Sequence, residues 1–168
     1  MKSFFSKYAI RILDWSVKRP DKGLLDDIFY YISRNTPLVN VDLLIKDKNQ
    51  RVLLAWRDDQ YTGKGWHIPG GILRYKENIK ERIKMVAESE IGASVICKPS
   101  LVALKEIIVD QQRDRGHFIS LLYTCTVHEE YRIDNGNLTP NQPGYLMWHN
   151  GCPDNLLSWH EIYRDYIK

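Results

Sequence analysis

Apolar residues recur along the chain with two kinds of spacing, one typical of strands and the other of helices. Short apolar runs bounded by polar turns predict strands at about 39–47, 51–57, 101–110, 118–127 and 145–148. Helical signals predict a central helix at about 79–91, a shorter helix at 24–33 and a last amphipathic helix that Asp154 caps and that ends near Ile167. Strands interrupted by one internal helix and closed by another indicate the α/β class.

The central helix has recognisable start and stop signals. Asn78 offers a side-chain oxygen as N-cap, Glu81 completes a capping box three residues later, and Gly92 supplies a left-handed stop. A Pro-Gly-Gly cluster at 69–71 comes shortly before this helix. Because glycines free the backbone and let a ligand approach closely, we expect a ligand-binding turn there.

Glu90 is an acidic residue on the apolar side of this helix. It follows Val86 by four residues and lies in the stripe that Ile79 and Ile83 begin. Burying an unpaired charge costs several kcal/mol, so such a glutamate is normally paired, protonated or bound to a cation. A hard divalent ion such as Mg²⁺ (or Mn²⁺) suits a carboxylate, with waters and phosphates as further ligands. A hydrogen bond to backbone near the helix end is the alternative.

The segment 66–93 resembles the Nudix box, whose pattern is Gly, five residues, Glu, seven residues, then Arg-Glu-U-x-Glu-Glu-x-Gly-U, where U is a bulky aliphatic residue. The positions that match are Gly71, Glu77, Glu90 and Gly92. Those that depart are Met85, Val86, Ser89 and Ala93. The resemblance implies the Nudix fold, an α/β/α sandwich with a mixed β-sheet.

The segments 35–42 and 53–57, together with the degenerate box, look like the GDP-mannose mannosyl hydrolase branch of this family. That branch attacks the sugar carbon of a nucleoside diphosphate sugar and releases GDP and the free sugar. The likeness covers roughly residues 36–148. Two alternatives stay open: a Nudix pyrophosphohydrolase of another nucleotide substrate, and a nucleotide-sugar-binding protein that has lost turnover.

The resemblance also implies roles for particular residues. The divalent cation, Mg²⁺ or Mn²⁺, is expected at Glu90, the carbonyl of Gly70 and Gln142, and substrate at Asp42 and Arg57. In the family the residue at Glu77 often pairs with the arginine of the box. Because Met85 removes that arginine, we expect Glu77 to be free to act at the metal or only to cap the helix.

Three family positions are altered in this chain. Ile72 stands where an arginine assists the leaving group, Pro143 where a histidine is the general base, and Phe118 where the family has tyrosine. General-base catalysis contributes roughly 10² to 10⁴ in rate, so another group serves or turnover is slow. The candidates for the base are His149, His117 and His128. For the lost arginine, Arg74 would share a face with Ile72 in an extended chain, and Arg113 and Arg115 are further candidates.

Length and composition bound the remaining expectations. The 168 residues, 43% of them hydrophobic, suit a single domain over 1–168 with an N-terminal helical extension at about 1–35. A formal charge of +3 is too small to argue for nucleic acid as a partner. The odd number of cysteines favours free thiols in a reducing compartment, and these thiols are Cys97, Cys125 and Cys152.

The N-terminal segment carries a helical apolar stripe formed by Phe5, Tyr8, Ala9 and Ile12, with Lys7 and Arg11 opposite. The stripe is short and its basic side sparse, so we expect it to pack against the domain or a second subunit, as in a homodimer, rather than on a membrane. No apolar run approaches membrane-spanning length, and the early basic residues do not suit a signal peptide. A cytoplasmic protein is expected.

Overall fold

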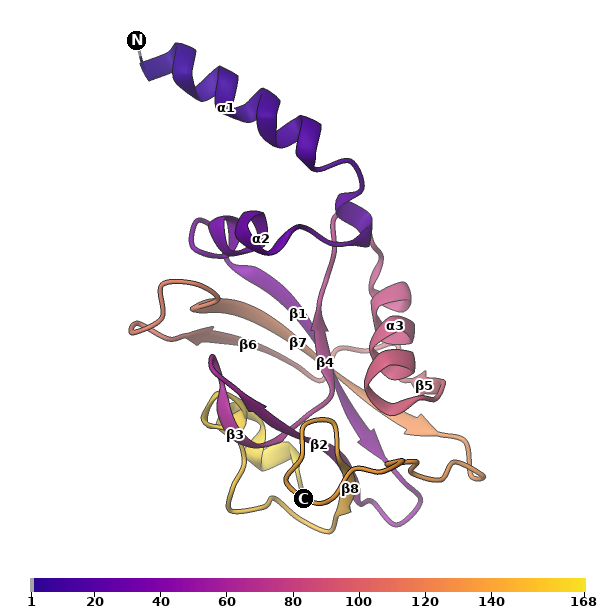
Figure 1. Ribbon diagram of the computed structural model, residues 1–168. Coiled ribbons are helices and arrows are strands. Elements are labelled where there is room, and N and C mark those ends of the chain that lie inside the picture. The colour runs from indigo at the N-terminus through magenta and orange to yellow at the C-terminus, as the bar shows by residue number, and fades with distance from the viewer. Residues whose placement is uncertain (1) are drawn as a thin grey trace.

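An eight-stranded mixed sheet forms the centre of the protein (Figure 1). The computed structural model describes residues 2–168, and side chains from Phe4 onward. The strands are β1 (Leu38–Lys46), β2 (Val52–Asp59), β3 (Gly63–His67), β4 (Gly70–Ile72), β5 (Val95–Cys97), β6 (Ala103–Ile108), β7 (His117–Val127) and β8 (Leu146–His149). The helices are α1 (Lys2–Ser16), α2 (Asp26–Ser33) and α3 (Ile79–Ile91), with 3-10 helices η1 (Pro20–Lys22) and η2 (Ser158–Tyr166).

The sheet contains one parallel pair. Strand β1 runs parallel to β7 along its whole length and antiparallel to β2 and β4. The main path through the sheet is β3-β2-β1-β7-β5, with β4, β6 and β8 pairing to β1, β7 and β2. The predicted α/β class with a mixed sheet is therefore confirmed.

Two hydrophobic cores lie on opposite faces of this sheet, because successive strand residues point to opposite sides. On β1, Val41, Leu43 and Ile45 join the core that α3 covers. Leu44 joins the other core, in which Tyr163 of η2 is buried. The sheet is thus enclosed between α3 and η2.

Local signals place α3 where the sequence predicts it. The Asn78 side chain accepts a hydrogen bond from the Glu81 amide at 2.9 Å, and the Glu81 carboxylate accepts one from the Asn78 amide at 3.2 Å. Gly92 ends the helix in the left-handed conformation, at φ 65°. Both caps are confirmed.

The C-terminal helix differs from the expectation. Residues 154–157 are not helical, and Asp154 does not cap a helix. Instead the Trp66 amide donates to the Asn155 carbonyl and the Leu157 amide donates to the Trp66 carbonyl. These bonds hold 155–157 against β3, so the helix starts later and is 3-10 rather than α.

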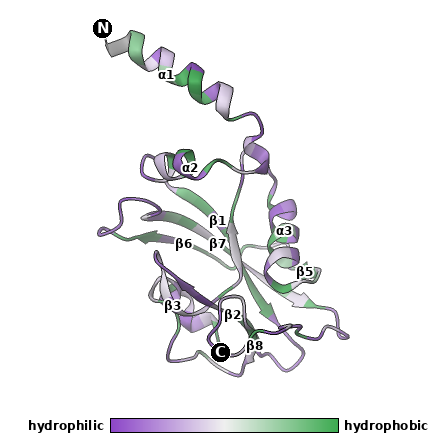
Figure 2. Cartoon of the chain, viewed as in Figure 1, coloured by the Kyte–Doolittle hydropathy of each residue, from purple (hydrophilic) through white to green (hydrophobic). Residues whose placement is uncertain are grey.

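Helix α1 projects away from the sheet (Figures 1 and 2). Its apolar side chains are exposed, with 67% of Phe5, 63% of Tyr8 and 75% of Trp15 accessible. Of the two partners expected for the stripe, the domain of the same chain is wrong, because the segment after α1 leads the helix away from both cores, and a second subunit stays a prediction. Among the described residues, no helix is long and apolar enough to cross a membrane.

Cys97 and Cys125 are joined by a disulfide between β5 and β7, where they pair directly across the two strands. The expectation of three free thiols is therefore wrong, and the argument from cysteines for a reducing compartment does not hold. Cys152 is a free, half-buried thiol. The sequence did not indicate β5, and without that strand the cross-strand pairing could not be predicted.

Candidate active site

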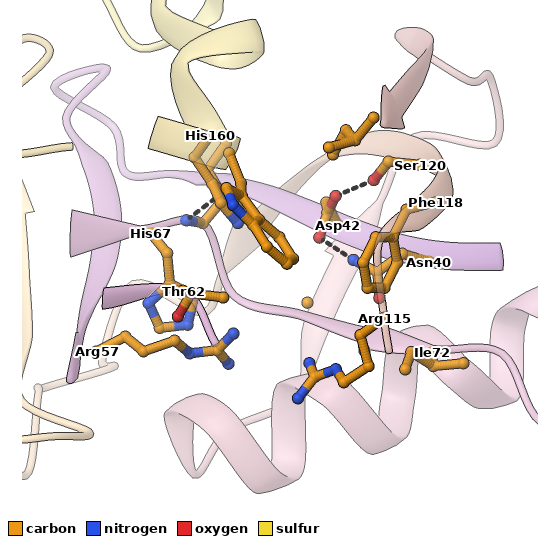
Figure 3. A pocket seen from close by; sticks show the side chains of 15 residues that line it. Asn40, Asp42, Arg57, Thr62, His67, Ile72, Arg115, Phe118, Ser120 and His160 are labelled. Atoms are coloured by element: carbon orange, nitrogen blue, oxygen red, sulfur yellow. Dashed lines mark hydrogen bonds between the residues drawn. The ribbon is translucent and has the colours of Figure 1, made fainter. Parts of the chain in front are cut away.

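A pocket opens where β1, β3, β4 and β7 meet η2 (Figure 3). Its cavity volume is about 150 Å³ and its mouth is open to solvent, so a ligand larger than this would lie partly outside the pocket. The residues that line the pocket include Asn40, Asp42, Arg57, His67, Gly70, Ile72, Arg115, Phe118, Ser120, Trp159 and His160.

Asp42 lies at the floor of this pocket and is almost fully buried. Its carboxylate accepts hydrogen bonds from the hydroxyls of Ser120 and Tyr163, the latter at 2.7 Å, and from the side-chain amide of Asn40 at 2.6 Å. Burial nevertheless raises the pKa of Asp42 to about 6, against the lowering effect of those hydroxyls and of the Arg57 charge. This carboxyl therefore titrates close to neutral pH.

Gly70 supports Asp42 by leaving room for it. The two residues face each other across the β1–β4 pair. A Cβ atom at position 70 would overlap the Asp42 carboxylate oxygen, so only glycine fits. The Pro-Gly-Gly turn thus brings backbone directly against a polar group of the pocket, as expected for a ligand-binding turn.

Two arginines enter the same pocket from different elements. Arg57 comes from β2 and lies 3.6 Å from the Asp59 carboxylate. Arg115 comes from the loop before β7, stacks over the Tyr61 ring at 5.2 Å, and has a buried Nε atom without a hydrogen-bond partner. Burial, and then the charge of Arg57, lower the pKa of Arg115. Two cations that repel each other in one pocket form a site for an anion.

His67, at the end of β3, faces Glu90 of α3. Its Nε2 atom is 3.7 Å from Glu90 Oε2, and neither ring nitrogen has a hydrogen-bond partner although the side chain is only 4% exposed. Burial lowers the pKa of His67, so the ring is neutral at pH 7. Burial alone would raise the pKa of Glu90, but the contact with His67 and the Arg57 charge outweigh it and lower that pKa. The partner that Glu90 was expected to need is therefore a histidine.

His160, on η2, contacts His67 edge-to-face, with ring centroids 5.7 Å apart. Its Nδ1 accepts a hydrogen bond from the Ile68 amide at 3.3 Å. Burial lowers the pKa of His160 well below its usual range, so the ring is neutral and carries its proton on Nε2. His160 therefore offers a hydrogen-bond donor to the pocket.

The comparisons with known proteins fit this geometry. The family model of the NUDIX domain matches residues 36–145, which hold β1, the turn, α3 and most of the pocket. The chain belongs to the Nudix family. It is a Nudix hydrolase by family, and its fold agrees with solved Nudix structures.

One curated relative of this Nudix chain is the low-salt glycan biosynthesis protein Agl8 of Haloferax volcanii, 26% identical over 67% of this chain and 73% of that protein. The structure is similar to a MutT Nudix hydrolase from Burkholderia pseudomallei, with a TM-score of 0.61 and 20% identity over 79% of this chain and 99% of the other. It is also similar to a UDP-X diphosphatase, with a TM-score of 0.57 and 18% identity over 77% of this chain and 59% of that one.

Contrary to expectation, the Glu77 carboxylate of the Nudix box is not free to bind a metal ion. Arg82 donates to its carboxylate from both Nε and Nη2, at 2.7–2.8 Å, and both side chains are about nine-tenths buried. The Glu77 carboxylate also accepts from the Arg74 amide. The expectation that Met85 leaves Glu77 free for metal is wrong, because Arg82 takes the place of the missing arginine.

Besides Glu77 and Glu90, four predicted site residues do not line the pocket. Arg74 approaches Gly23 instead, and Gln142 is exposed, its side-chain oxygen accepting from the Thr139 amide. His117 contacts Glu106 at 3.2 Å on the β7–β6 edge, and His149 is buried with its ring 4.6 Å from that of Trp66. The structure brings together Asp42, Arg57 and Gly70, with Glu90 reaching the site through His67.

Nudix hydrolases generally use divalent cations such as Mg²⁺. Within residues 2–168, no group of three or more His, Cys, Asp or Glu side chains is arranged to hold a metal ion. The chain therefore offers one acidic side chain, Glu90, beside the unpartnered nitrogens of His67. This set fits a cation that takes most of its other ligands from backbone, water and substrate.

Sequence reasoning missed His67 and His160, and gave Arg115 little weight. His67 stands in the Trp-His-Ile-Pro-Gly-Gly turn, where its position two residues before the proline was a usable signal. His160 reaches the turn from 92 residues away in the sequence. No local pattern could indicate that contact.

Proposed function

We propose that this Nudix hydrolase acts on a nucleoside diphosphate sugar, of the GDP-mannose type, and releases the nucleoside diphosphate and the free sugar by attack at the anomeric carbon. The observation that carries the proposal is the pair of arginines, Arg57 and Arg115, in one pocket with a polar floor. An arginine fork binds phosphate oxygens bidentately, and two forks match the two phosphates of a diphosphate.

The remaining pocket walls suit a sugar. Asn40, Asp42 and Ser120 provide a floor of donors and acceptors for hydroxyl groups. Phe118 and Trp159, with ring centroids 5.7 Å apart, form an aromatic wall. His160 adds a neutral donor. The relative from Haloferax volcanii is named for glycan biosynthesis, which supports a sugar-containing substrate for this chain as well.

The chemistry needs negative charge to be stabilised on the departing diphosphate. In the proposed function Arg57 and Arg115 bind it, and Arg115 takes over from the arginine that Ile72 replaces. A divalent cation, Mg²⁺ or Mn²⁺, held by Glu90 and the carbonyl of Gly70, would add charge stabilisation when bound. Because Pro143 cannot transfer a proton, we expect slow turnover compared with relatives that have histidine there.

The test is a product assay over a panel of nucleotide sugars with Mg²⁺ and with Mn²⁺, run in ¹⁸O-labelled water. Label in the free sugar, with a nucleoside diphosphate as the other product, supports attack at carbon. Label in a phosphate, with nucleoside monophosphate and sugar phosphate, indicates a pyrophosphohydrolase. Saturable binding without products with either metal would favour the binding-protein alternative and overturn the hydrolase assignment.

Variants connect the assay to the pocket. Arg57→Lys keeps the charge and loses the fork, so the Kd for the nucleotide sugar should rise roughly tenfold. Arg51→Lys is the matched control, because Arg51 pairs with Asp47 at 2.7 Å outside the pocket. Equal weakening in both variants would remove Arg57 from substrate binding.

A further inference from the structure

His67 is a buried polar side chain that the fold leaves unsatisfied. The ring is 4% exposed, and neither Nδ1 nor Nε2 makes a hydrogen bond of good geometry, although the Glu90 carboxylate and the Ala55 backbone lie close enough to act against the lowering of its pKa by burial. Buried polar atoms are nearly always paired, and each exception calls for an explanation such as a bound ion. The contact with Glu90, at 3.7 Å, is too long for a hydrogen bond.

The separation between His67 Nε2 and Glu90 Oε2 suits two ligands of one cation. Ligands at about 2.0–2.2 Å from a metal lie about 3 Å apart at right angles and farther apart at wider angles. The observed 3.7 Å needs only a small movement of either side chain to reach that geometry. His160 meets the same ring edge-to-face, with ring centroids 5.7 Å apart.

The box supplies an independent reason for a second ligand. Two of its acidic positions hold Val86 and Ser89, and Glu77 is bound by Arg82. Among the described residues, Glu90 is then the box carboxylate near His67 that forms no ion pair with an arginine, although the Arg57 charge acts on it from farther away. A cation held by a single carboxylate is weakly bound, and Arg57 nearby opposes its charge. A nitrogen ligand at the same site would raise the affinity for the cation and offset part of this weakness.

We propose that His67 is a metal ligand of this protein and that, with Glu90, it makes a mixed nitrogen and oxygen site selective for transition ions such as Mn²⁺ and Co²⁺ over Mg²⁺. The inference rests on the cation of the proposed function and specifies its coordination. Imidazole favours transition metals, whereas Mg²⁺ prefers oxygen and gives up water reluctantly.

The test uses Mn²⁺, Co²⁺ and Mg²⁺ alone as probes, titrated calorimetrically into the full chain. His67→Phe keeps an aromatic ring, slightly larger than imidazole, and removes both nitrogens. We expect the Kd for Mn²⁺ and Co²⁺ to rise by about tenfold or more and the Kd for Mg²⁺ to change by less than about threefold. His149→Phe is the matched control, because His149 is also buried with an unpartnered Nε2 but lies outside the pocket.

Pulsed electron paramagnetic resonance of bound Mn²⁺ provides a readout that does not depend on the variant folding. The wild-type protein should show ¹⁴N modulation that changes to the ¹⁵N pattern when histidine is ¹⁵N-labelled. Mn²⁺ that binds, requires Glu90 (lost in Glu90→Gln) and shows no nitrogen coupling would overturn the role of His67 while leaving the proposed cation intact. Absence of Mn²⁺ and Mg²⁺ binding to the wild-type protein would instead overturn the metal of the proposed function, and this inference with it.

Discussion

Replacing Asp42 by asparagine should remove a pH dependence from the stability of this protein. Asparagine keeps an oxygen toward the hydroxyls of Ser120 and Tyr163, which donate to one carboxylate oxygen. Its amide nitrogen would face Asn40, whose side chain can rotate to offer its own oxygen. The substitution therefore resembles permanent protonation of Asp42 with little change in shape.

The magnitude follows from the pKa of Asp42, which burial raises from 3.8 to about 6. A group whose folded pKa is raised stabilises the fold below its unfolded pKa, and that contribution is lost as pH rises through the folded pKa. Each pKa unit is worth about 1.4 kcal/mol, so ionising Asp42 costs about 3 kcal/mol in total, of which about 2 kcal/mol develops between pH 4 and pH 7. Asp42→Asn should escape this loss.

The assay is urea denaturation of both proteins at pH 4, 5, 6 and 7.5, with the difference in unfolding free energy plotted against pH. Subtraction cancels the other carboxylates, several of which have lowered pKa values and act in the opposite direction. The difference should grow in favour of Asp42→Asn by about 2 kcal/mol or more and level off above pH 7. A difference that stays constant would show that Asp42 has an ordinary pKa and would refute the reasoning from burial.

Three further predictions test the pocket and its supports. Arg115→Lys should raise the Kd for nucleotide sugar about tenfold, whereas Arg51→Lys should not, as measured by calorimetry. An unchanged Kd in Arg115→Lys would show that the Arg115 guanidinium does not bind a phosphate of the substrate. Arg82→Leu should lower the unfolding free energy by about 3 kcal/mol, because it leaves the buried Glu77 carboxylate without a charged partner and with the Arg74 backbone amide as its donor, and adding Glu77→Leu should recover part of that loss. Deleting residues 1–16 should shift the Tm by less than about 2 °C, because α1 does not contact either core; a larger fall would indicate that a second copy covers it.

Elements with local signals could be predicted from the sequence, and α3 is the clearest example. Its cap, capping box and stop lie within 15 residues, and each is observed. The short strands β3 and β4 could not be predicted, because glycines at 63, 65, 70 and 71 have no strand preference of their own, and β5 is a run of only three residues. These strands form through backbone pairing with longer neighbours.

The candidate site was predictable only in part, for the same reason. Asp42, Arg57 and Gly70 were identified through segments that keep the family pattern. Arg115 depends on a loop whose backbone takes a positive φ of 59°, and His160 depends on a 3-10 helix that starts later than expected. Both positions are set by tertiary contacts rather than by spacing in the sequence.

Val86, which stands where the Nudix box has an acidic residue, helps to explain how the remaining charges of the site are arranged. Val86 is almost fully buried in the core under the sheet, and a Cβ atom at Gly71 would come within 3.0 Å of its methyl group. A glutamate at 86 would lie in that apolar core unless a cation held it. Valine at this position therefore holds the Pro-Gly-Gly turn against α3 by apolar packing, where a glutamate could have held it through a metal ion bound by both. Charge stabilisation in the pocket then falls to Arg57 and Arg115, and the proposed cation site to Glu90 with His67.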